Sequence, residues 1–211
     1  MTDLRRLTAE ELVAWLGPWN PLSRSASSDL LRGAGVPWWI GGGWALEAAG
    51  MAARPHADVD IIVLGVDLPP LLDHLRAKGL HPWAAHDGAL HPLPPGAALP
   101  LGAHDVWLRR GGDQPWLLEV ISTPMAPDWA GWAYPRDQHL RLTIEELGVT
   151  RADGLPYLRP EVALLFKAEL RRERDEADLA ATLPLLSGDA RRWLAAALPA
   201  GHPWLPTVAA G

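Results

Sequence analysis

The sequence predicts a mixed α/β (α+β) fold, in which a mixed β-sheet with flanking helices is followed by a helical C-terminal part. Three patterns lead to this prediction. The apolar run Val36–Ile40 ends in three glycines that open a helical stretch, and a second apolar run, Val59–Leu64, comes soon after. From Pro160 onward, apolar residues recur at helical spacing opposite a charged face. The first part therefore alternates strands with helices, and the last part is helical.

The elements of the first part follow from local signals. The capping box Thr8–Glu11 predicts an N-terminal helix. Asp67 is expected to begin a helix that runs to about Lys78, because prolines are tolerated in the first turn. Residues 86–102 are rich in Pro, Gly and Ala and predict a long loop. Two runs, Asp105–Leu108 and Trp116–Ile121, predict a hairpin whose tryptophans pack in the core.

The C-terminal part is expected to contain one long helix from Pro160 to about Leu183 and a last helix from Ser187 to before Pro199. We therefore expect two units, a first domain of residues 1–150 and a helical subdomain of residues 151–211.

Composition limits the chemistry. The 211 residues include no cysteine, so disulfides, thiolate zinc sites and cysteine nucleophiles are excluded. A net charge of −6 fits a cationic small molecule better than nucleic acid, and we expect no nucleic-acid partner. The first residues lack a basic segment before an apolar run, and no stretch reads as a membrane span, which predicts a cytoplasmic protein.

Two acids at the start of an apolar strand are the strongest functional signal. Asp58 and Asp60 point to the same face, with Cα atoms roughly 6.6 Å apart, because side chains alternate along a strand. Buried carboxylates need a partner, and Mg²⁺ is the natural one. Such sites are commonly completed by a third acid from a neighbouring strand. Glu119 is the first candidate, and Asp105 is the alternative.

The glycines before the first helix are a weaker signal. Glycine at a helix start lets backbone N–H groups approach a phosphate. The sequence does not contain the Gly-x-x-x-x-Gly-Lys of a P-loop, and neither Lys78 nor Lys167 lies near these glycines.

These residues resemble a known family. The order Gly42-Gly43-Trp44-Ala45-Leu46-Glu47, then Arg54-x-His56, then Asp58-x-Asp60 resembles the nucleotidyltransferase superfamily that includes DNA polymerase beta, and more narrowly the aminoglycoside 2''-nucleotidyltransferase-like (adenylyltransferase) family. The stretch 157–168 and the run 174–178 resemble its C-terminal signature. The resemblance implies a nucleotidyltransferase-type sheet.

It also implies roles. Asp58, Asp60 and Glu119 would be the catalytic acids and magnesium ligands, with Glu119 accepting the proton of a substrate hydroxyl. Gly42 and Gly43 would line the triphosphate of ATP or another nucleoside triphosphate.

Four further side chains are candidates for binding the nucleotide. Arg54 would contact phosphate or pair with Asp58, and His56 would bond phosphate or a carboxylate or extend the metal site. Lys167 and Arg174 are seven residues apart and are expected to share one face of the long helix, where they would neutralise triphosphate or position the third acid. Aromatic rings that could stack on a base or sugar are Trp129, Trp132 and Tyr134.

The expected activity is magnesium-dependent transfer of a nucleoside monophosphate, AMP from ATP first of all, to a hydroxyl of a small molecule such as an aminoglycoside. Such an enzyme would take part in antibiotic resistance. Two alternatives remain open at this point: an acceptor that is a protein or RNA, as in toxin and antitoxin systems, and a non-catalytic nucleotide-binding protein on the same scaffold. The sequence does not indicate an oligomeric state.

Overall fold

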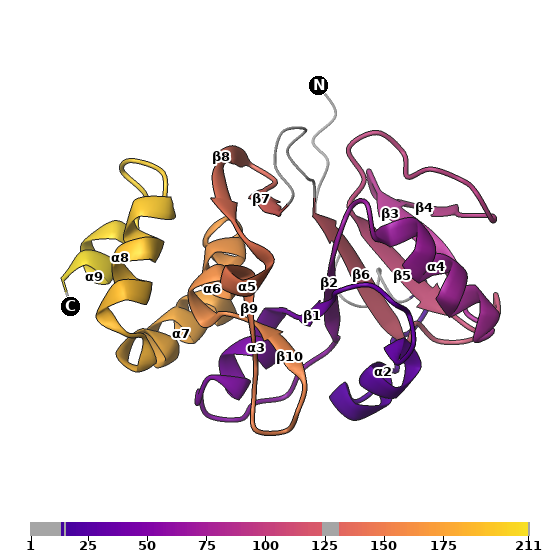
Figure 1. Ribbon diagram of the computed structural model, residues 1–211, viewed down its shortest axis with the longest axis horizontal. Coiled ribbons are helices and arrows are strands. Elements are labelled where there is room, and N and C mark those ends of the chain that lie inside the picture. Colours follow the sequence, from indigo (N-terminus) through magenta and orange to yellow (C-terminus); the bar gives the residue numbers. More distant parts are fainter. Residues whose placement is uncertain (1–13, 15, 124–130, 211) are drawn as a thin grey trace.

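The computed structural model describes residue 14 and residues 16–123 and 131–210. The helix predicted from Thr8–Glu11 and the aromatic candidate Trp129 lie outside the described residues. The fold is a mixed α/β arrangement built on one large sheet, as predicted (Figure 1). The helices are α2 Arg24–Leu31, α3 Gly42–Ala48, α4 Leu68–Ala77, α5 Ile144–Leu147, α6 Pro160–Ala168, α7 Glu173–Thr182, the 3₁₀ turn η1 Leu183–Leu185, α8 Gly188–Ala197 and α9 Leu205–Ala209.

The strands follow the order β4-β3-β5-β6-β2-β1-β10-β9 in an eight-stranded sheet, and β7 pairs with β8 in a separate two-stranded sheet. Two neighbouring pairs, β2 with β6 and β1 with β10, are parallel, so the sheet is mixed. The strands are β1 Trp39–Ile40, β2 Asp60–Leu64, β3 His81–His86, β4 Ala89–Pro92, β5 Asp105–Arg109, β6 Leu118–Thr123, β7 Trp132–Tyr134, β8 Asp137–Leu142, β9 Gly148–Thr150 and β10 Pro156–Leu158.

The central strand β2 shows why the site lies where it does. Its residues 61–64 are buried and apolar, which suits a strand with neighbours on both sides, whereas its first residue, Asp60, is only partly buried. The preceding β1 is short, since it covers only Trp39–Ile40 of the predicted 36–40 run, and Gly41 then caps α3. The polar start of β2 and the N-terminus of α3 therefore meet at one end of the sheet.

Two sequence predictions are wrong in detail. Part of the predicted loop 86–102 forms β4, which pairs with β3, because Asp87 and Gly88, with φ of 50° and 71°, make the two-residue turn of a hairpin. The single long helix from Pro160 is two helices, α6 and α7. The helical conformation is interrupted between them, where Arg171 takes a positive φ of 45°. The Asp175 carboxylate then accepts a hydrogen bond from the Arg172 N–H, and α7 begins.

Other predictions are confirmed. The hairpin of β5 and β6 is antiparallel, and α8 begins after its cap, Ser187. β10 belongs to the large sheet although it lies beyond residue 150, and the division into domains 1–150 and 151–211 stays a prediction. Helices α3, α6 and α7 pack together, so the C-terminal helices contact the segment that opens the site. Within the described ranges, none of the helices combines the length and apolar character needed to cross a bilayer.

Candidate active site

Three carboxylates come together at the end of the central strands. Asp60 on β2 lies directly opposite Glu119 on the parallel strand β6, and Asp58 precedes Asp60 by two residues. One carboxylate oxygen from each of these three residues lies within 4.8 Å of the others. All three side chains are partly buried. Oxygen donors in this number and at this spacing suit a hard divalent cation such as Mg²⁺.

The electrostatics of the cluster are those of acids forced together. Burial, and then the charge of Asp58, raise the pKa of Asp60 to about 7. Burial, and then the charges of Asp60 and Asp105, raise the pKa of Glu119 well above its usual range. Asp60 and Glu119 also share a hydrogen bond. Asp60 and Glu119 therefore bind protons more readily than free carboxylates do, and a cation would compete with those protons.

The two candidates for the third acid occupy different positions. Glu119 belongs to the cluster of three, whereas Asp105 pairs in register with Ile121, two residues further along β6. Asp105 is near enough to raise the pKa of both Asp60 and Glu119, and burial raises its own pKa. In the described part of the chain, the geometry thus brings Glu119, rather than Asp105, against the aspartate pair.

The glycines make room for this cluster. Gly42 has a positive φ of 55°, and a Cβ at this position would collide with the Asp60 carboxylate. A Cβ at Gly43 would meet Arg54 and the His56 ring. The space that both glycines leave is therefore filled by candidate site residues.

Arg54 and His56 are held by acids that the sequence did not single out. Arg54 donates two hydrogen bonds to Asp178 on α7, from Nε at 2.9 Å and from Nη2 at 2.8 Å. It therefore pairs with Asp178 instead of the predicted Asp58. His56 contacts Glu47 through Nε2 at 3.0 Å and Arg54 through Nδ1 at 3.3 Å.

The surroundings of His56 define the protonation state and the tautomer of its ring. Burial is the largest of the effects that lower its pKa, so the ring is neutral near pH 7. Since Arg54 can only donate, Nδ1 accepts, and Nε2–H donates to Glu47. The ring stacks on Trp44 at a centroid distance of 3.9 Å. Both nitrogens are engaged, so His56 bonds a carboxylate, which was one of its predicted roles, and does not extend the metal site.

Lys167 and Arg174 do not share a face, contrary to the prediction. Lys167 is buried on α6, and its Nζ lies 2.9 Å from Asp178 and 3.3 Å from Asp175. Its charge lowers the pKa of Asp60. Arg174 is exposed on α7, beyond the break between the two helices. The prediction failed because it assumed one continuous helix.

Asp178 joins the two parts of the site. Burial alone would raise its pKa, but the hydrogen bonds from Arg54 and Lys167 outweigh burial and lower it. The side chain is 3% exposed. One carboxylate thus connects the loop before β2 with α6 and α7. A signal for it existed in the sequence, in the run 174–178, but nothing in that run distinguished Asp178 from a solvated acid.

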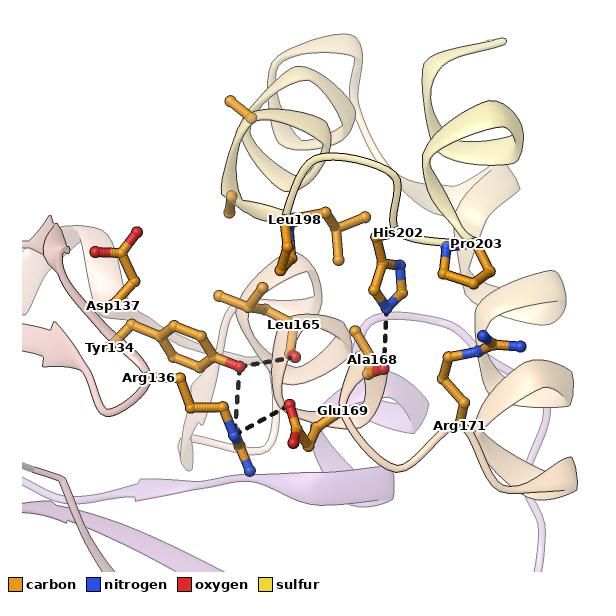
Figure 2. Close-up of a pocket in the computed structure, with 13 residues that line it drawn as sticks. Tyr134, Arg136, Asp137, Leu165, Ala168, Glu169, Arg171, Leu198, His202 and Pro203 are labelled. Carbon is orange, nitrogen blue, oxygen red and sulfur yellow. Dashed lines mark hydrogen bonds and ion pairs between the residues drawn. The ribbon is translucent and has the colours of Figure 1, made fainter.

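One cavity borders this region, and a second lies against the C-terminal helices. One, of about 520 Å³, is lined by Asp58, His56, Trp44 and Arg24 among others, and the Arg24 guanidinium lies over the Trp44 ring at 4.6 Å. The other, of about 590 Å³, lies between the β7–β8 turn and the C-terminal helices (Figure 2).

The second cavity is lined by a connected polar group. Arg136 bonds the Tyr134 hydroxyl at 3.1 Å and Glu169 at 3.2 Å, as Figure 2 shows. The charge of Arg136 also lowers the pKa of Asp105, against the larger effect of burial. Tyr134 lines the cavity, but Trp132 is fully buried and packs on Phe166, which excludes it as a stacking platform for a ligand.

Comparison with known proteins relates the segment that carries the aspartate pair to a known family. Residues 26–86 match the model of the aminoglycoside-2''-adenylyltransferase family. The matched segment contains Asp58, Asp60 and both glycines, but not Glu119. No curated protein matches the sequence.

Two solved structures share the fold. The crystal structure of ANT(2'')-Ia in complex with adenylyl-2''-tobramycin is 15% identical, with a TM-score of 0.51, over 80% of this chain and 91% of that one. The lincomycin-bound lincosamide antibiotic adenylyltransferase LnuA is 17% identical, with a TM-score of 0.53, over 79% of this chain and 100% of that one. The segment 26–86 is thus similar to the aminoglycoside-2''-adenylyltransferase family, and the fold of the chain is shared with these two solved structures.

Proposed function

We propose that this protein transfers a nucleoside monophosphate, AMP from ATP first of all, to a hydroxyl of a small molecule in a magnesium-dependent reaction. The observation that carries the proposal is the convergence of Asp58, Asp60 and Glu119 beside the glycine turn of α3. Three carboxylates brought this close together are poorly explained by stability, because each costs free energy to bury.

Mg²⁺ fits this donor set, with Asp58 and Asp60 as its principal ligands and Glu119 as the third. When bound, the cation would neutralise charge on the triphosphate and on the attacking oxygen.

Side chains of this protein would transfer the proton and position the reacting groups. Glu119 accepts the proton of the acceptor hydroxyl. The hydroxyl oxygen then forms a bond to the α-phosphorus, the bond from that phosphorus to the bridging oxygen breaks, and pyrophosphate leaves with that electron pair.

The nucleotide would bind next to the acids. We assign Gly42 and Gly43 to the triphosphate, with Arg54, Lys167 and Arg174 as the surrounding cationic groups. His56 would act through Arg54, to which its Nδ1 is bonded. Arg54 and Lys167 are both bonded to Asp178, so their side chains are already ordered. They would supply positive potential to the nucleotide and would lose less conformational freedom on binding it than mobile side chains would. Arg174 is exposed and would act at longer range.

An antibiotic is the acceptor class that the comparisons favour. The net charge of −6 agrees with a cationic acceptor such as an aminoglycoside. The fold is shared with proteins described as bound to adenylyl-tobramycin and to lincomycin, so both classes belong in the test.

The test is pyrophosphate release from each ribonucleoside triphosphate with Mg²⁺, against aminoglycosides, lincosamides and other polyols. We expect release that requires one acceptor and is lost in Asp60→Ala, while Asp87→Ala, at an exposed turn, retains it. Release without any small-molecule acceptor, but with added protein or RNA, would replace the proposed acceptor class. Nucleotide binding without release under all conditions would contradict the proposal and favour a binding protein.

A further inference from the structure

One carboxylate oxygen of Glu119 is held by a tryptophan. Trp107 on β5 is the register partner of Glu119 on β6, and its indole Nε1–H donates a hydrogen bond of 2.9 Å to Glu119 Oε1. On the other side, Asp60 is the register partner of Glu119 on β2. The three side chains thus form a row across three neighbouring strands, on one face of the sheet.

Trp107 is itself fixed by aromatic packing. Its ring meets Trp19 edge-on at a centroid distance of 5.1 Å and Trp116 edge-on at 5.6 Å. Trp116 is fully buried and donates its indole N–H to the carbonyl of Leu16 at 2.6 Å. Edge-to-face packing of this kind stabilises one ring orientation over others.

The N-terminal segment closes this cluster. Asn20 and Leu22 donate backbone hydrogen bonds of 2.9 Å to Trp116 and Leu117, which places Trp19 against the strand that carries Glu119. Trp19, Trp107 and Trp116, which we call the tryptophan cluster, therefore fix the ring whose N–H is bonded to Glu119.

We propose that Trp107 is a positioning residue for Glu119: it fixes one carboxylate oxygen, so that the other faces Asp60 and the reacting groups. A carboxylate at the end of a flexible side chain has several rotamers, and glutamate has one more rotatable bond than aspartate. A charge-assisted hydrogen bond from a rigid donor removes that freedom. The catalytic part of this inference rests on the proposed transferase function.

The first experiment tests the hydrogen bond without any activity. In ¹⁵N-labelled protein, the Trp107 indole N–H signal is identified by its loss in Trp107→Phe. We expect this signal to shift in Glu119→Ala, and a signal that is indifferent to Glu119→Ala overturns the proposal. A shifted signal in a protein that releases no pyrophosphate would keep Trp107 as the partner of Glu119 and contradict the proposed function instead.

The second experiment tests the effect on the reaction. Trp107→Phe is expected to lower kcat about tenfold, with the KM for nucleotide within about twofold of wild type. The matched control is Trp83→Phe, because Trp83 packs edge-on against Trp116 at 6.3 Å but does not bond Glu119. It should retain wild-type kcat. Equal kcat in wild type and Trp107→Phe, or an equal loss in Trp83→Phe, would overturn the proposal.

A double-mutant cycle distinguishes an effect of Trp107 on the position of the Glu119 carboxylate from a general loss of rigidity in the protein. In Glu119→Gln, measured at high enzyme concentration, Trp107→Phe should lower kcat by no more than about twofold, because it acts through the carboxylate. A further tenfold loss in that background would show that Trp107 acts by another route and would overturn the proposal.

Discussion

Asp60 and Glu119 are direct register partners on the parallel strands β2 and β6, and they share a hydrogen bond. Parallel strands of a sheet place such partners on the same face, so the two acids meet although they are far apart in the sequence. Burial, and then the charge of Asp58, raise the pKa of Asp60, whereas burial, and then the charge of Asp60, raise the pKa of Glu119.

Asp60→Asn should remove transferase activity. The amide keeps the size of the side chain but loses the negative charge that holds a cation, so we expect kcat to fall at least about a hundredfold. Mg²⁺ affinity, followed by calorimetry, should fall with it. Full activity in Asp60→Asn would contradict the assignment of the acid cluster.

The same substitution should change how stability depends on pH. With the cation chelated, the pKa of Asp60 is raised to about 7, whereas an aspartate in the unfolded chain titrates near about 3.9. The folded state therefore binds more protons between these values, so its free energy of unfolding falls as the pH rises through this window. We expect Asp60→Asn to be more stable than wild type at pH 7.5, by on the order of 2 kcal/mol, and to lose this advantage near pH 4.

Urea unfolding in the presence of a chelator, at several pH values, measures this difference. Asp87→Asn is the control, because it makes the same chemical change at a side chain that is 87% exposed. A difference between Asp60→Asn and wild type that does not vary with pH would contradict the raised pKa.

Gly42→Ala should damage the site beyond its effect on the backbone. A Cβ here meets the Asp60 carboxylate and must also adopt a positive φ. The control is Gly33→Ala, which has a φ of 83° and no atom within 4 Å of the added Cβ. Both variants should lose about 1 kcal/mol of stability from backbone strain. Only Gly42→Ala should lose Mg²⁺ affinity, and equal affinity in the two variants would show that the close approach has no function.

Asp178→Asn should destabilise the protein strongly. It leaves Arg54 without its bidentate partner and Lys167 with Asp175 alone, and loss of one member of a buried charge group costs about 3 kcal/mol. Asp189→Asn is the comparison, because its ion pair with Arg192 is exposed and is worth about 0.5 kcal/mol or less. Urea unfolding of both variants tests this difference. Similar losses would show that the Asp178 network contributes no more than a surface pair.

Local patterns were sufficient for the central elements. The glycine turn with its helix, the strand after Asp58 and the β5–β6 hairpin depend on spacing and turn residues that act within a few positions. The break between α6 and α7 could not be predicted in this way. It depends on Asp175, which caps α7 and pairs with Lys167 at the same time, and that pairing exists only once the helices have packed.

The sequence by itself determined which residues are candidates for the chemistry: the aspartate pair at the start of a buried strand and the glycines before a helix. Periodicity and steric limits act along the chain and can be recognised in the residues themselves. Only the tertiary structure decided which side chains these candidate residues contact. Strand register set Glu119 between Asp60 and Trp107, and helix packing set Asp178 between Arg54 and Lys167. Such pairings join residues that are distant in sequence, so they are fixed by packing and buried charge.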